Sequence, residues 1–183
     1  MASNPRESQE PPSVPSCAPK YPQPIAREWI DATPNIDLPR LLWDYLLTWF
    51  DAHRSEANPL ELPMGLRVVY FYTVFDGDVL NGGIVQFFQN NTPREVEETR
   101  RLLRLIGAKD SAEVLTKAID VFVRKYDWPA HSDKRWRCYE AYNDADIEAL
   151  TRMRCDDESS GRDYELVAAY CRSHPEEFSI QMG

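Results

Sequence analysis

The sequence predicts an all-α fold, a single-domain bundle of several helices preceded by a disordered, proline-rich N-terminal arm. Apolar residues recur at three- and four-residue intervals through most of the chain. Helix start and stop signals flank several of these segments, and no segment alternates convincingly as a half-buried strand does. A chain of 183 residues is expected to hold one core, so the helical domain is assigned to residues 26–183.

The N-terminal arm covers residues 1–25, which contain seven of the fourteen prolines among Ser and Gln. Such a composition buries too little apolar area to offset the entropy lost on ordering, so we expect disorder there. A dispensable leader is the favoured interpretation, because chain termini are commonly loose. An extended binding segment is the alternative.

The first strong helix begins at Leu38, where Asp37 is available as an N-cap and Pro39 is tolerated in the first turn. Its apolar positions are Leu38, Leu41, Leu42, Tyr45, Leu46, Trp49 and Phe50. Residues 62–80 form a nearly continuous apolar run that is too long for an ordinary strand. We therefore expect a buried central helix there.

The next two helices carry clear start signals. Thr92-Pro93-Arg94-Glu95 is a capping box with Pro at the first helical position, and that helix should stop at Gly107. Residues 110–113 repeat the start signal, which predicts a second helix, antiparallel to the first, ending near Pro129. Shorter helical pieces are expected around residues 136–142, 147–153 and 164–171, with a loop over 156–161.

Between the central helix and the capping box, residues 78–90 read Asp-Val-Leu-Asn-Gly-Gly-Ile-Val-Gln-Phe-Phe-Gln-Asn. Glycine inside a helix costs up to about 1 kcal/mol relative to alanine, so the pair at Gly82 and Gly83 indicates a specified turn before a short helical segment. Helical spacing places Gln86 and Asn90 on one face. We expect the amides of Asn81, Gln86 and Asn90 to bond nearby main chain, with ligand contact as the alternative. Phe87 and Phe88 are expected in the core.

Acidic residues concentrate toward the C-terminus of a chain whose net charge is −9. Residues 139–183 have a net charge of −7, whereas residues 94–138 have a net charge of +3. This balance argues against direct binding of nucleic acid or of an anionic membrane. The candidate partner-binding carboxylates are those of Glu140, Asp144, Asp146, Glu148, Asp156, Asp157 and Glu158.

These carboxylates can be arranged in two ways. If one helix ran through Glu140, Asp144 and Glu148, the three would form a row resembling spaced phosphates, whereas a cap at Asn143 would interrupt it. An ordinary solubilising surface is the favoured interpretation from the residues alone.

Catalytic and metal-binding residues are not assigned. The four cysteines and three histidines lack metal-ligand spacing, and Asp76-Gly77-Asp78 fails as a calcium loop because Leu80 occupies a ligand position. No nucleophile elbow or phosphate loop occurs, and no cofactor is expected. The sequence has no apolar run of about 18 residues and does not begin like a secretory signal, so we expect a cytoplasmic protein with reduced cysteines.

The motif at residues 78–90 resembles the core of a bacterial DNA-mimic protein family of otherwise unknown function. That family's pattern is acidic-x-x-Asn-Gly-Gly-aromatic-x-Gln-Phe-Phe-x-Asn, and the chain departs from it at Ile84. The similarity covers roughly residues 35–178 and includes the helix end at residues 102–108. It implies an all-helical domain without cofactor or catalysis, and a homodimer whose acidic surface imitates DNA to occupy a transcription factor. The mimic's carboxylates lie outside the shared motif.

The leading hypothesis is therefore a non-enzymatic acidic protein that docks on a basic protein, with a DNA-binding transcription factor as the expected partner. An immunity or inhibitor protein for a basic toxin nuclease is the first alternative. The second is a small-molecule-binding protein or enzyme that uses Asn81, Gln86 and Asn90 in a pocket.

Overall fold

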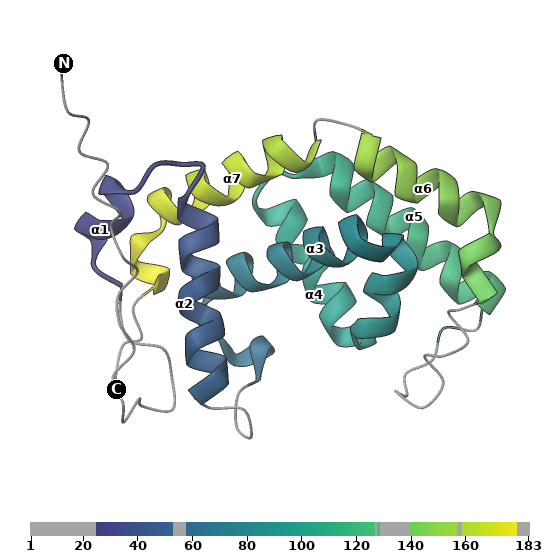
Figure 1. The fold of residues 1–183 in the computed structure, drawn as a ribbon, viewed down its shortest axis with the longest axis horizontal. Helices are drawn as coiled ribbons and strands as arrows, with labels where there is room; N and C mark the ends of the chain where they lie inside the picture. Colours follow the sequence, from purple (N-terminus) through teal and green to yellow (C-terminus); the bar gives the residue numbers. More distant parts are fainter. Residues whose placement is uncertain (1–24, 53–57, 127, 129–139, 157–158, 179–183) are drawn as a thin grey trace, which may run out of the picture.

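A computed structural model describes residues 25–52, 58–126, 128, 140–156 and 159–178. This part of the chain contains α-helices and short 3-10 turns but no strand, which confirms the predicted all-α fold (Figure 1). Residues 1–24 of the predicted arm lie outside the described residues. The α-helices are α1 (Arg27–Ala32), α2 (Leu38–Ala52), α3 (Met64–Asn90), α4 (Pro93–Leu105), α5 (Lys109–Tyr126), α6 (Ala145–Asp156) and α7 (Ser159–Ser173).

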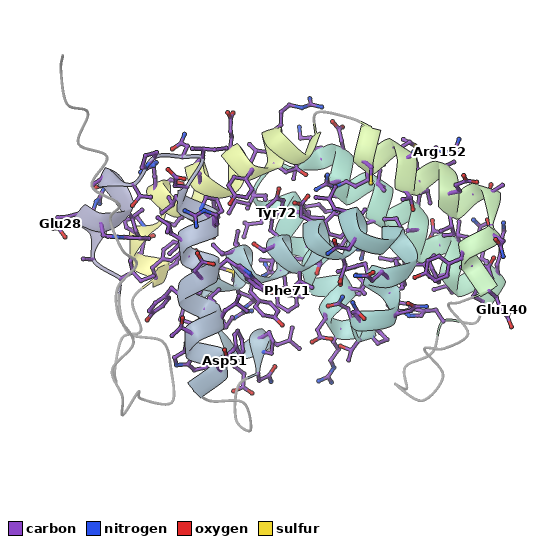
Figure 2. The ribbon with its side chains drawn as sticks, in the orientation of Figure 1. Glu28, Asp51, Phe71, Tyr72, Glu140 and Arg152 are labelled. Atoms are coloured by element: carbon purple, nitrogen blue, oxygen red, sulfur yellow. The ribbon has the colours of Figure 1, made fainter. Side chains whose placement is uncertain are left out.

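Helix α3 runs through the middle of the molecule and packs against α2, α4, α6 and α7 (Figure 1). Most of its residues are apolar, so nearly every face of the helix can be buried against a neighbour. Figure 2 shows Phe71 and Tyr72 among the surrounding helices, and both side chains are buried. The buried central helix predicted over residues 62–80 is confirmed.

One core joins all of the helices. Its buried side chains run from Ile25 before α1 to Phe178 in the 3-10 turn that follows α7. Ile25 was assigned to the arm, but it is buried and its N–H donates to the carbonyl of Phe178 at 3.4 Å. No helix among the described residues combines the length and the apolarity needed to cross a membrane.

The ends of α4 follow the predicted signals. Glu95 N–H donates to Thr92 Oγ1 at 3.3 Å, and Thr92 N–H donates to a carboxylate oxygen of Glu95 at 2.6 Å. These two bonds form the capping box. At the other end Gly107 has a φ of 84°, and Ala108 N–H donates to the carbonyl of Leu103 at 2.9 Å, which closes the helix.

Two predicted boundaries were wrong. Helix α5 begins at Lys109, so Asp110 lies in its first turn and does not precede it. The cause is that the Ala108 carbonyl already accepts the Ala112 N–H at 3.0 Å. The loop expected over residues 156–161 is shorter, because α6 extends to Asp156 and α7 begins at Ser159. Residues 136–139 of a predicted helical piece lie outside the described residues.

Arg172 of α7 connects the N-terminal segment to the bundle. Its guanidinium donates to the main-chain carbonyls of Ile30, Asp31 and Thr33, and its Nε donates to Asn35 Oδ1 at 2.8 Å. Carbonyl groups at a helix end lack partners inside the helix, so a cation there is favourable. One side chain therefore holds both α1 and the residues that lead into α2.

Candidate functional site

Helix α3 bends at Gly82 and Gly83, as the glycine pair predicts. Gly83 has φ 73° and ψ −175°, a conformation that residues with a side chain rarely adopt. At Gly82 an added Cβ would collide with the side-chain amide of Gln86. Both positions therefore require glycine, for two different reasons.

A carboxylate holds the bend together. Gln86 Nε2 and Asn90 Nδ2 donate to Asp78 Oδ1 at 3.1 and 2.8 Å, and Asn91 Nδ2 donates to Asp78 Oδ2 at 3.1 Å. In a straight helix, residues twelve apart are separated by about 18 Å along the axis, so these bonds require the sharp change of direction. The amide cluster is thus a clamp across the bend.

The predicted roles of the amides need correction. Gln86 and Asn90 were expected to bond nearby main chain, but both side chains donate to the carboxylate of Asp78, which the bend brings within reach. Asn91, which the sequence interpretation missed, makes a main-chain bond, to the carbonyl of Phe87 at 2.8 Å. Phe87 and Phe88 are fully buried, as expected for core residues. The acidic position that opens the family pattern was the available signal for Asp78.

Helix α6 packs directly on the bend. Ile84 N–H donates to Thr151 Oγ1 at 3.2 Å. A Cβ at Gly83 would lie 3.1 Å from two atoms of the Thr151 side chain, closer than an ordinary contact. The Asn-Gly-Gly motif and the acidic C-terminal region, which are far apart in the sequence, therefore meet in the fold.

A groove of about 340 Å³ lies between the bend and α6. Buried side chains of Val79, Val85 and Ile147 line it, and Leu80 and Tyr142 border it with exposed fractions of 57% and 44%. Polar groups on the groove come from Asn81, Glu148, Thr151 and Cys155. Of the three amides considered from the sequence, Asn81 lines this groove, whereas Gln86 and Asn90 are engaged by Asp78.

Asp144 occupies the position before α6 and acts as its N-cap. Its Oδ1 accepts the N–H groups of Asp146 and Ile147 at 2.8 and 3.3 Å. Its Oδ2 accepts the Tyr126 hydroxyl at 2.6 Å and Lys125 Nζ at 3.0 Å. The Tyr126 bond, supported by Lys125 and the two backbone donors, lowers the pKa of Asp144 to about 2. The side chain therefore carries its charge in a fixed position.

The carboxylates of Glu140, Asp144 and Glu148 do not form a row on one helix. Helix α6 begins only at Ala145, and its N-cap is Asp144 and not Asn143. Asp146 shares Lys125 at 2.6 Å, and Glu148 pairs with Arg152. Figure 2 shows Glu140 and Arg152 at the same end of the molecule, far from Glu28. Asp156 ends α6, while Asp157 and Glu158 lie outside the described residues. Four described carboxylates thus gather around the start of α6.

A buried charged network lies elsewhere in the bundle. Arg154, whose side chain is 1% exposed, contacts Asp76 at 2.6 Å and Asp163 at 3.9 Å and lies over the ring of Phe75. Ser111 donates a hydrogen bond to Asp163. Burial raises the pKa of Asp163 above its ordinary value. These residues come from α3, α5, α6 and α7, so no local motif in the sequence could reveal the network.

Metal-binding chemistry finds no support among the described residues, where no three His, Cys, Asp or Glu side chains are placed to share an ion. Cys155 is exposed on α6, whereas Cys171 is buried, and burial raises the pKa of its thiol. Cys17, Cys138, His53 and His131 lie outside the described part of the chain.

Comparison with known proteins connects the site to one family. A family model described as DMP19-like protein matches residues 60–174. The matched segment contains the glycine bend, the amide clamp, the groove and the carboxylates around α6. Searches of curated proteins and of solved structures gave no significant match.

Proposed function

Because the chain belongs to the DMP19-like protein family, we propose that it is a non-enzymatic acidic protein that docks on a basic protein. Our leading hypothesis for the partner is a DNA-binding regulator that the protein occupies as a DNA mimic. The observation that carries the proposal is the cluster of Glu140, Asp144, Asp146 and Glu148 around the start of α6, beside exposed apolar side chains.

Charge supports this choice of partner. Two cations, Lys125 and Arg152, pair with these carboxylates in the described part of the chain. The cluster therefore keeps a negative balance on a protein whose net charge is −9. Such a surface attracts a cationic partner over distances comparable to the Debye length, about 10 Å at 0.1 M salt.

The arrangement of the carboxylates supports a partner that normally binds DNA. Phosphates follow one another at about 3.4 Å along each strand, whereas carboxylates one helical turn apart are separated by about 6 Å. A single helix is therefore a poor imitation of a phosphate row. Here Glu140 precedes α6, Asp144 caps it, and Asp146 and Glu148 lie on it, so a turn and a helix both contribute.

Exposed apolar groups favour a protein partner over a purely ionic contact. Leu80 and Tyr142 border the groove next to Glu148. Apolar surface rimmed by charged groups is typical of protein–protein interfaces. Opposite charges would then speed the encounter, and apolar contacts would slow dissociation.

The test is capture on the immobilised full-length protein, with the bound protein identified by mass spectrometry. We expect a basic DNA-binding protein that duplex DNA releases at constant ionic strength, and that is lost as salt rises from about 0.05 to 0.5 M. The triple variant Glu140→Gln, Asp146→Asn, Glu148→Gln should retain much less of it. The matched control replaces Glu28, Glu113 and Glu165, which are exposed elsewhere on the surface, with Gln. Equal retention at both salt concentrations, or by the triple variant, would contradict the proposal.

A further inference from the structure

We propose that the groove between the Gly82–Gly83 bend and α6 is a docking site, and that it receives the apolar face of a basic amphipathic helix. This inference deepens the proposed function and rests on it. It names the part of the surface that the partner contacts and the kind of structural element that the partner presents.

The groove offers an apolar base that a partner side chain can cover. Val79, Val85 and Ile147 line it and are each 2% exposed, so they form a packed wall. Leu80 extends from its edge with more than half of its surface exposed. Removing such an aliphatic side chain from water is favourable in proportion to the apolar area covered. A partner that covers Leu80 while inserting its own apolar side chain gains from both.

Asn81 is the residue of the glycine motif that the internal packing leaves unexplained. Its side chain is exposed at the groove and makes no hydrogen bond with the described residues. Asparagine is also a weaker helix former than alanine or leucine, so the helix itself gives no reason for it. Its amide supplies both donors and an acceptor to a partner.

Glu148 gives the groove its preference for a cation. It lies on the α6 side, and its exposed carboxylate pairs with the exposed guanidinium of Arg152, four residues later. Exposed ion pairs of this kind contribute little to stability, so an incoming Lys or Arg can replace Arg152 at little cost. Asp144 and Asp146 extend the negative charge along the start of α6.

These features favour a helix as the occupant. The apolar groove between α3 and α6 carries the carboxylate of Glu148 on its α6 side, and an amphipathic helix presents the complementary arrangement of apolar residues flanked by Lys or Arg. Binding by strand addition would instead need the edge of a sheet, and the described part of the chain contains no strand.

The direct test uses the full-length chain and a synthetic helical peptide with leucines on one face and Lys or Arg on the other. Cys155 lines the groove and is exposed, so peptide binding should slow its alkylation at least fivefold, measured by peptide mass spectrometry. Two control peptides carry Glu in place of every cation, or Ser in place of every leucine. We expect neither to protect Cys155.

Variants locate the contact. Leu80→Ser and Asn81→Ala should each weaken peptide binding several-fold, and the double variant at least tenfold. Leu105→Ser is the matched control, because Leu105 is 46% exposed on α4, outside the groove. The side chains of Leu80, Asn81 and Leu105 are all exposed, so the circular dichroism and the melting temperature of these variants should be unchanged.

The outcomes separate this inference from the proposed function. If carboxylate replacement abolishes capture while Leu80→Ser and Asn81→Ala bind normally, docking occurs elsewhere and the groove proposal is wrong, although the proposed function stands. Equal protection by the Ser-substituted peptide would show a purely ionic contact and would also overturn it. If sedimentation shows a dimer that Leu80→Ser disrupts, the groove belongs to a second copy of the chain and is not the docking site. If neither partner capture nor peptide binding depends on charge, both proposals are wrong.

Discussion

Asn90 donates a 2.8 Å hydrogen bond to the carboxylate of Asp78, twelve residues earlier in the same helix. The bond forms because α3 bends sharply at Gly82 and Gly83, which brings the helical segments before and after the bend close together. Asp78 also accepts bonds from Gln86 and Asn91, so one carboxylate serves three amides. The geometry of the bend therefore depends on this side chain.

Replacing Asp78 with Ala should lower the free energy of unfolding by about 2–3 kcal/mol, because three amide donors lose an ionised acceptor and Asn91 is buried. Urea denaturation measures this change. Asp120→Ala, at an exposed position of α5, is the control and should shift stability by no more than about 0.5 kcal/mol. Identical midpoints for both variants would show that the clamp contributes nothing.

Two glycines of α3 should respond oppositely to alanine. Gly83→Ala should destabilise the protein by about 1–3 kcal/mol, because the backbone conformation disfavours a side chain and Thr151 is close. Gly77 lies inside the helix with no neighbouring atom in the way, so Gly77→Ala should stabilise by about 0.5–1 kcal/mol. Melting temperatures of the two variants provide the comparison, and a shift of the same sign in both would contradict the assigned bend.

Removal of the buried guanidinium of Arg154 should strongly destabilise the folded protein. Arg154→Met leaves Asp76 and Asp163 without their shared partner, which should cost about 3–5 kcal/mol. Arg152→Met, on the exposed side of the same helix, should cost less than about 1 kcal/mol. Adding Asp163→Asn to Arg154→Met should recover part of the loss, because it removes one uncompensated charge. A double variant less stable than Arg154→Met would contradict this account.

Asp144 predicts a specific dependence of stability on pH. Its pKa in the folded protein is about 2, below its ordinary value of 3.8. The unfolded chain therefore takes up this proton first, so the stabilisation is complete above about pH 4 and is lost as the pH falls toward 2. Asp144→Asn keeps a capping side chain but should cost about 1–2 kcal/mol at neutral pH.

The measurement is thermal unfolding of the native protein and of Asp144→Asn between about pH 6 and pH 2. The difference between them should shrink across the acidic part of this range. The carboxylate of Asp146 is exposed and pairs with the same lysine. The melting temperature of Asp146→Asn should therefore differ much less from that of the native protein. A difference that is constant with pH would mean that the bonds to Asp144 do not distinguish its charged form.

The helices that could be predicted are those whose limits depend on neighbouring residues. The capping box of Thr92 and Glu95 and the turn at Gly107 are determined within a few positions, and the structure has both. The start of α5 was predicted about two residues too late, because the helix begins at Lys109. Its first hydrogen bonds depend on the tight turn at Gly107, which competes with the apparent cap at Asp110.

The candidate site was less predictable, because its partners come from distant segments. The glycine pair indicated a bend, but its angle decides that Gln86 reaches Asp78 and not the main chain. Composition located the acidic residues, yet Lys125 on α5 decides how much charge Asp144 and Asp146 leave uncompensated. Such pairings depend on the packing of α5 against α6, which no local pattern encodes.

The contacts of Arg172 also bear on where the independently folding unit starts. The family match begins at residue 60, but Arg172, inside the match, is bound to carbonyls of Ile30, Asp31 and Thr33, which precede it. A fragment trimmed to residues 60–174 would leave this guanidinium without its acceptors and would uncover the side of α3 that α2 protects. Recombinant fragments intended for binding studies should therefore begin no later than Ile25.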